Sequence, residues 1–60
     1  MTLSEITKKT RQEMRLSQKK FAVLVNSNQT EISFIERGFI PTDQDKINRI
    51  YDLYNNLLKG

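Results

Sequence analysis

Residues 18–37, QKKFAVLVNSNQTEISFIER, decide the fold of this 60-residue chain. Apolar residues recur at three-to-four spacing on both sides of Asn26, which is typical of two amphipathic helices. These residues are Phe21, Ala22 and Val25 before it, and Ile32 and Ile35 after it. Because Asn tolerates the left-handed backbone conformation of a tight turn, the stretch predicts two short helices joined at Asn26.

The ends of these two helices carry the expected signals. Ser17 is a good N-cap for the first helix. Ser27 is the expected N-cap of the second helix, which should run to about Arg37, with Gly38 as its stop.

Flanking segments also have a helical period. Leu3, Ile6 and Met14 predict a helix over about residues 4–14. Thr42, after Pro41, is the expected cap of a last helix, with an apolar period that continues to the end of the chain. Asn55-Asn56 would have to break this helix to allow a fifth one. The sequence therefore predicts a single all-α domain, 1–60, built as a bundle of four to five helices.

Composition excludes several function classes. The chain has no cysteine and no histidine, so disulfides, the common zinc sites and the usual neutral-pH general base are absent. We therefore expect no enzyme activity, no metal and no cofactor. The first ten residues lack the apolar core of a signal peptide, and the longest apolar run, FAVLV, is too short to cross a bilayer. We expect a cytoplasmic protein without a membrane partner.

Charge is distributed unevenly along the chain. Residues 1–20 hold six Lys or Arg against two Glu, and residues 21–60 hold four against five acids. The net charge of +3 thus comes from the first third of the chain, +4 against −1. This asymmetry is a mild signal for a polyanionic partner, although a basic helix face is often simply solvated.

The helix expected after Asn26 has two different faces. At about 100° per residue, Gln29, Thr30, Ser33 and Arg37 fall on one side, whereas Ile32 and Ile35 fall on the other, together with Glu31 and Glu36. Amide side chains can pair with adenine in the DNA major groove, hydroxyls serve several bases, and Arg takes guanine or phosphate. A polar, mostly uncharged face of this kind suits groove reading.

Residues 18–37 resemble the helix-turn-helix of the lambdoid phage repressor and Cro proteins, the Xre-like family. Gln18 opens the motif, Ala22 is its small fifth residue, Asn26 stands at the ninth position where the family usually has Gly, and Ile32 and Ile35 fill two of its apolar positions. The flanking LSQ at 16–18, IERG at 35–38 and Pro41-Thr42 are also similar. The resemblance covers about residues 6–53.

The resemblance implies roles for individual residues in binding double-stranded DNA. The second helix of such a motif enters the major groove and the first contacts the backbone. It assigns base reading to Asn28, Gln29, Thr30 and Ser33, and phosphate contacts to Gln18, Lys19, Ser27 and Arg37. Lys19 and Lys20 oppose the dipole at their helix start, which a nearby phosphate would help to explain, although both can be ordinary solvent-exposed groups.

Two further residues are expected to act structurally. The resemblance implies that Arg11 and Glu36 form a partly buried ion pair that ties the first helix to the third. Arg15 stands in the turn where the family frequently has Gly, so this turn can differ in shape. Phe34, at the flank of the outward face, either contacts a thymine methyl or packs on the edge of the core, and we favour packing.

The end of the last helix is more apolar than a small monomer can easily hide. Related domains dimerise near this end and bind half-sites about 34 Å apart. We therefore expect a weak homodimer through Tyr51, Tyr54, Leu57 and Leu58 on a palindromic operator. The alternative is that these residues close the monomer core against Leu3 and Ile6.

The sequence thus predicts a sequence-specific DNA-binding transcriptional regulator, most simply a repressor of the Cro or CI kind from a phage or mobile genetic element. One alternative is a protein-interaction or antitoxin-like module. The other is the DNA-binding head of a longer, ligand-sensing regulator.

Overall fold

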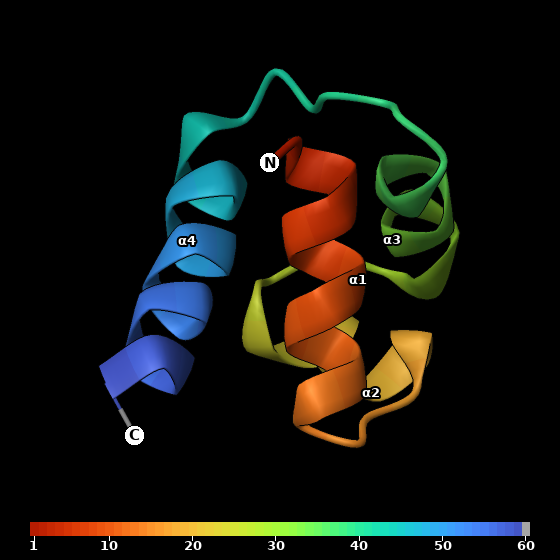
Figure 1. The fold of residues 1–60 in the computed structure, drawn as a ribbon. Helices are drawn as coiled ribbons and strands as arrows, with labels where there is room; N and C mark the ends of the chain where they lie inside the picture. Colours follow the sequence, from red (N-terminus) through yellow and green to blue (C-terminus); the bar gives the residue numbers. More distant parts are fainter. Residues whose placement is uncertain (60) are drawn as a thin grey trace.

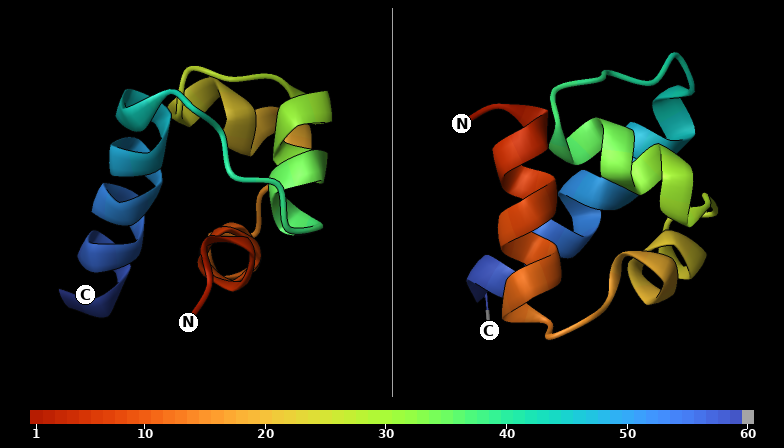
Figure 2. Two further views of the ribbon diagram at one scale, coloured as in Figure 1. Left: turned by 90° about the horizontal axis from the view of Figure 1, so that it is seen from above. Right: turned by 90° about the vertical axis from the view of Figure 1, so that its right-hand side faces the viewer.

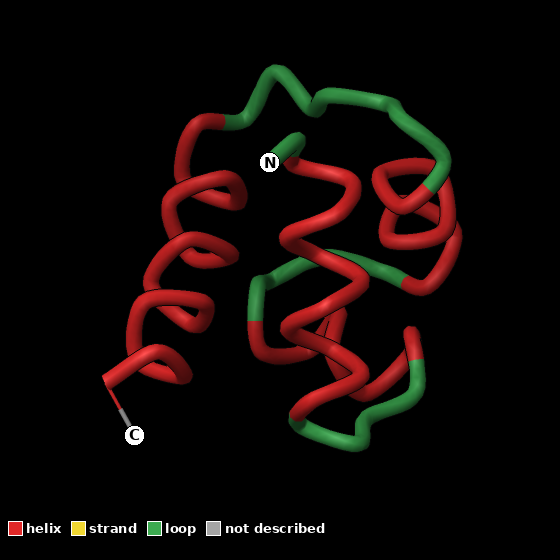
Figure 3. The backbone as a smooth tube through the Cα atoms, viewed as in Figure 1, coloured by secondary structure: helices red, strands yellow, loops and turns green. Residues whose placement is uncertain are grey.

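A computed structural model describes residues 1–59, which form four helices and no strand (Figures 1 and 3). The helices are α1 (Leu3–Glu13), α2 (Gln18–Leu24), α3 (Gln29–Glu36) and α4 (Gln44–Lys59). Seen from above, α1 is viewed end-on between α4 on one side and α3 on the other (Figure 2). The all-α class predicted from the sequence is confirmed.

All four helices contribute to one core. Its buried apolar residues are Ile6, Phe21, Ala22, Val25, Ile32, Ile35 and Ile50, none more than 5% exposed. α1 packs against α3 and α4, and α2 packs against α3. The apolar stripes found in the sequence at 21–25 and 32–35 therefore face inward together, and the opposite side of α3 is left on the surface.

The helix starts differ from the sequence-based prediction at two positions. α1 begins after Thr2 and α2 begins after Ser17, each with a side chain that caps the first turn, so the expectation for Ser17 is confirmed. Ser27 does not cap α3: Asn28 does, and its Oδ1 accepts from the N–H of Glu31 at 2.8 Å. The Ser27 hydroxyl instead donates to the Glu31 carboxylate.

The start of α4 is shifted in the same way. Thr42 was expected to cap this helix, which instead begins at Gln44. The Asp43 carboxylate accepts from the N–H of Asp45 at 3.0 Å, so Asp43 satisfies a free donor of the first turn. Its negative charge also suits the positive end of the helix dipole better than a hydroxyl does.

Each of the first three helices ends in the same type of turn. Arg15, Asn26 and Gly38 have φ values of 57°, 56° and 115°, and each follows the C-cap residue of its helix. In each turn the N–H of the next residue bonds back five positions: Leu16 to Arg11, Ser27 to Ala22 and Phe39 to Phe34. These bonds define Schellman motifs. Arg15 thus keeps the left-handed turn although it is not Gly.

α4 runs unbroken through Asn55 and Asn56 to Lys59, so the described residues contain no fifth helix. Gly60 lies outside the described residues. None of the helices in residues 1–59 is long and apolar enough to span a lipid bilayer.

Two buried hydroxyls on α1 lack a partner among the described residues. Thr7 and Thr10 are fully buried, and neither Oγ1 atom has a hydrogen-bond partner. A buried polar group that makes no hydrogen bond costs about 1–3 kcal/mol relative to a satisfied one. The core of this small domain therefore contains a destabilising feature, which raises the importance of its other contacts.

Candidate nucleic-acid interface

Among the predicted base-reading residues, Gln29 and Thr30 are those whose side chains are both exposed and free of hydrogen bonds within residues 1–59. Both lie in the first turn of α3. Their amide and hydroxyl groups are therefore free to bond an external partner. Ile32 and Ile35, on the other side of the same helix, are fully buried and fix which face looks outward.

Asn28 and Ser27 are already engaged at the start of α3. The Oδ1 of Asn28 accepts from the Glu31 N–H, which leaves the side-chain NH₂ as its free donor. Ser27 is half-buried and its hydroxyl donates to Glu31. Both residues hold the first turn of α3, and of the two only Asn28 presents an exposed side chain.

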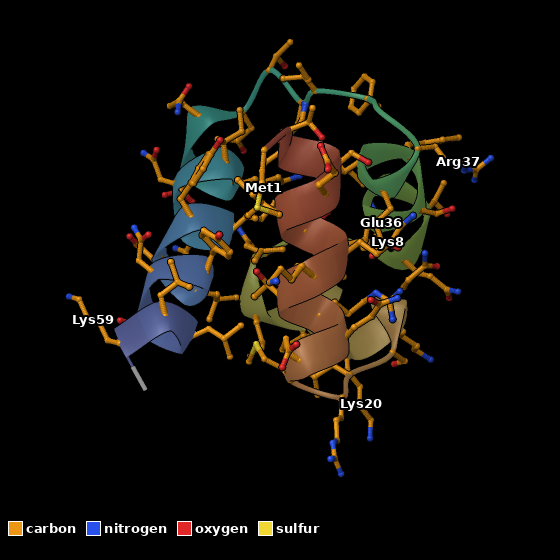
Figure 4. The ribbon with its side chains drawn as sticks, in the orientation of Figure 1. Met1, Lys8, Lys20, Glu36, Arg37 and Lys59 are labelled. Carbon is orange, nitrogen blue, oxygen red and sulfur yellow. The ribbon has the colours of Figure 1, made fainter. Side chains whose placement is uncertain are left out.

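Ser33, Phe34 and Arg37 lie together near the end of α3. The Nη2 of Arg37 donates to the Ser33 Oγ at 2.6 Å, and its Nε donates to the Ser33 carbonyl at 3.3 Å. The guanidinium carbon of Arg37 lies 5.2 Å from the centre of the Phe34 ring, whose residue is 48% exposed. Phe34 therefore packs on Arg37 more than on the core, and Arg37 points away from α1 (Figure 4).

Gln18 contacts a buried ion pair. The carboxylate of Glu36 accepts hydrogen bonds from Arg11 Nε at 2.6 Å, from Arg11 Nη2 at 3.2 Å and from Gln18 Nε2 at 3.3 Å. The side chains of Arg11 and Glu36 are 19% and 6% exposed. The structure thus joins α1, α2 and α3 at one carboxylate, and the Gln18 side chain, predicted to hold a phosphate, is oriented by Glu36.

Basic side chains surround the start of α2. Lys19 and Lys20 are exposed in its first turn, and Arg15 is exposed in the turn before it. Lys20 extends away from the protein at this end of the molecule (Figure 4). The structure therefore has a positively charged end at α2, next to the helix that carries the free amide and hydroxyl groups.

One ion pair that the sequence did not predict joins α3 to α4. Lys46 Nζ lies 2.8 Å from Glu31 Oε1, and both side chains are partly buried. The hydrogen bonds from Lys46 and Ser27 lower the pKa of Glu31. Because that pKa is lowered in the folded state, the pair stabilises the fold above the ordinary pKa of Glu and loses this effect as the pH falls. In the sequence, the signal for this ion pair was the position of Glu31 beside Ile32, on the inner face of the helix.

The four residues predicted at the dimer interface separate into two groups. Tyr54 packs against the core, and its hydroxyl lies 3.5 Å from the Met1 sulfur. Tyr51 and Leu58 are 38% and 64% exposed, and Leu57 is half-buried. Tyr54 thus takes part in closing the monomer, as the alternative reading expected.

Comparisons with protein families, with curated proteins and with solved structures found no match to this chain. The likeness to the phage repressors therefore rests on residues 18–37 and their flanks alone.

Proposed function

We propose that this chain is a sequence-specific DNA-binding domain in which α2 and α3 act as a helix-turn-helix. In this proposal α3 enters the major groove, where Gln29 and Thr30 contact base edges, assisted by the free NH₂ of Asn28. Gln18, Lys19 and Arg37 bind phosphates beside the groove.

The observation that carries the proposal is the free polar turn at the start of α3. The side chains of Gln29 and Thr30 there are exposed and unpaired and carry uncharged hydrogen-bonding groups. The exposed lysines Lys19 and Lys20 lie at the start of α2, the helix that packs against α3. Helix α3 is held rigidly by buried Ile32 and Ile35, by the Glu36 ion pair and by Lys46. Base readout requires a recognition helix that is held in a fixed position and has a polar face toward the DNA.

A role as a small repressor of the Cro or CI kind, from a phage or mobile genetic element, follows from the sequence resemblance. Such a protein binds a palindromic operator as a dimer, with half-sites about 34 Å apart. The longest dimension of this domain is 28 Å, measured on Cα atoms. This Cα extent is shorter than the expected half-site spacing.

Gln29→Ala provides the first test. Selection from a random duplex pool should recover a palindrome, and Gln29→Ala should weaken binding to that site by about 1–3 kcal/mol while relaxing selectivity at one position of each half-site. Asn56→Ala, at an exposed amide of α4 that lies away from Tyr51 and Leu58, is the matched control and should leave both unchanged. Fluorescence anisotropy with selected and random duplexes measures the two quantities.

Salt dependence adds an independent criterion. Log K should fall with log salt concentration at about −0.9 per phosphate contacted. Equal loss of selected and random binding in Gln29→Ala would exclude base reading by that residue.

A protein-interaction module is the second candidate. Val23 on α2, and Phe39 and Ile40 in the loop after α3, are apolar side chains that remain 76%, 51% and 67% exposed and so could contact a protein. Binding of a protein partner through these residues would depend little on salt, so the same titration separates the two functions. The proposed DNA binding would be equally compatible with a place at the head of a longer regulator.

A further inference from the structure

The side chain of Arg37 is held at one edge of its guanidinium. Nε and Nη2 form that edge, and both donate to Ser33, one to the backbone carbonyl and one to the hydroxyl. No acceptor within residues 1–59 bonds the Nη1 atom. The adjacent terminal edge, formed by Nη1 and the outer hydrogen of Nη2, therefore keeps two parallel donors that match the oxygens of a phosphate.

The plane of the guanidinium is fixed as well. The Phe34 ring lies 5.2 Å from its central carbon and covers one side. Phe34 remains 48% exposed, so the contact lies at the surface of α3. With one edge bonded and one side covered, Arg37 presents a single edge to solvent in a defined direction.

We propose that Ser33, Phe34 and Arg37 form a preformed phosphate clamp, in which Ser33 is a positioning residue for Arg37 and not a base reader. The clamp rests on the proposed DNA binding and refines it. Its ligand is one phosphate of the duplex backbone. An arginine side chain normally loses much rotamer freedom when it binds, and Ser33 and Phe34 remove most of that freedom before DNA arrives.

The place of Arg37 on α3 favours a phosphate over a guanine. Base contacts come from the amino-terminal residues of a recognition helix. Arg37 is the C-cap residue, eight positions after Gln29, so it lies roughly 12 Å further along the helix axis at 1.5 Å per residue. At that distance from the base-reading turn, the nearest acceptors are the phosphates of the DNA strand that borders the major groove.

A double-mutant cycle tests the positioning role. Arg37→Ala should weaken binding to the selected duplex about tenfold, as expected for the loss of a charge-assisted contact. Ser33→Ala should weaken it about threefold through Arg37, and should have no further effect in the Arg37→Ala background. Ser33→Thr keeps the hydroxyl and should restore wild-type affinity.

A second measurement detects the clamp without DNA. In the free protein, the Arg37 Nε–H proton should exchange with water more slowly than that of Arg15, which is exposed and whose side chain forms no hydrogen bond within residues 1–59. Ser33→Ala should remove this difference while the amide spectrum of the remaining core stays unchanged. Equal exchange of the two protons in wild type would overturn the preformed geometry.

Modified duplexes identify the acceptor. Replacing single phosphates by neutral methylphosphonates should find one position whose effect disappears in Arg37→Ala, whereas 7-deazaguanine substitution should show no such coupling. Coupling to 7-deazaguanine, or additive effects of Ser33→Ala and Arg37→Ala, would overturn the clamp even if Gln29→Ala still relaxes selectivity. Absence of duplex binding by wild type would overturn the clamp together with the proposed function.

Discussion

The Glu36 side chain connects three helices. Its carboxylate accepts from Arg11 of α1 and Gln18 of α2, and its backbone carbonyl accepts from the Ser4 hydroxyl at 2.5 Å. Arg11 in turn donates to the carbonyl of Leu16 at 3.1 Å, between α1 and α2. A buried ion pair with this many hydrogen bonds is neutral or modestly stabilising when intact, and strongly destabilising when one partner is removed.

Arg11→Met should therefore destabilise the domain by about 3 kcal/mol, because it leaves Glu36 buried without its cation. Methionine keeps most of the apolar packing of the arginine stem. Urea unfolding followed by circular dichroism measures the change. Arg49→Met is the matched control: its pair with Asp45 is exposed, with side chains 50% and 61% accessible, so no measurable change is expected. Equal destabilisation by the two substitutions would show that the buried pair has no special weight.

Some residue contacts were predictable and others were not. Arg11 with Glu36 was expected from the family resemblance. The bond between Ser33 and Arg37 was within reach, because residues four apart on a helix are neighbours, but both had been assigned to DNA on the outward face. Lys46 could not be identified, since its approach to Glu31 depends on how α4 crosses α3.

The turns after the first three helices show how local sequence sets the elements. Each needs a left-handed residue, and the chain uses Arg15, Asn26 and Gly38 in turn. Gly adopts this conformation without strain and Asn tolerates it, whereas a side chain such as Arg costs about 1–2 kcal/mol there. The α1–α2 turn is therefore the strained one of the three.

Arg15→Gly should stabilise the domain by about 0.5–1 kcal/mol, because the relief of strain exceeds the added entropy of the unfolded chain. Thermal unfolding measures this change. Arg15→Ala removes the charge but keeps the Cβ, so it should give no such gain. A gain of the same size in Arg15→Ala would assign the effect to charge and contradict the strained turn.

Four helices and their order could be predicted from the apolar period, but neither the absence of a fifth helix from the described residues nor two of the helix starts could. Ser27 and Asn28 are both good capping residues, so the sequence alone does not separate them. In the structure Asn28 is the cap, because its Oδ1 accepts from the Glu31 N–H, whereas the Ser27 hydroxyl donates to the Glu31 carboxylate. The same holds for Thr42 and Asp43, since adjacent capping residues shift a helix start by one position.

At the scale of the whole molecule, α4 leaves two large apolar side chains on a surface that is otherwise polar. Tyr51 and Leu58 are exposed there, while Tyr54 packs on the core. This division leaves Tyr51 and Leu58 accessible to a second copy, and the homodimer stays a prediction. How α4 lies on α1 decided which residues were left outside, and the period of the sequence could not show that.

Sedimentation equilibrium should therefore show a concentration-dependent mass for wild type and a monomer for Leu58→Asp, because a charge would be buried in the interface. Val23→Asp is the matched control. Val23 is 76% exposed on α2, so this variant should associate like wild type. Identical monomer masses for all three proteins at millimolar concentration would exclude the dimer.

Binding of a DNA duplex by the outward side of α3 can be observed directly. The most direct measurement is a titration of the ¹⁵N-labelled protein with the selected duplex, followed through its backbone and side-chain amide signals. The largest changes should fall on Gln29, Thr30 and the side-chain NH₂ groups of Asn28 and Gln29, with smaller changes at Lys19 and Arg37. Changes confined to α4, or none in residues 28–33 at saturating duplex, would contradict it.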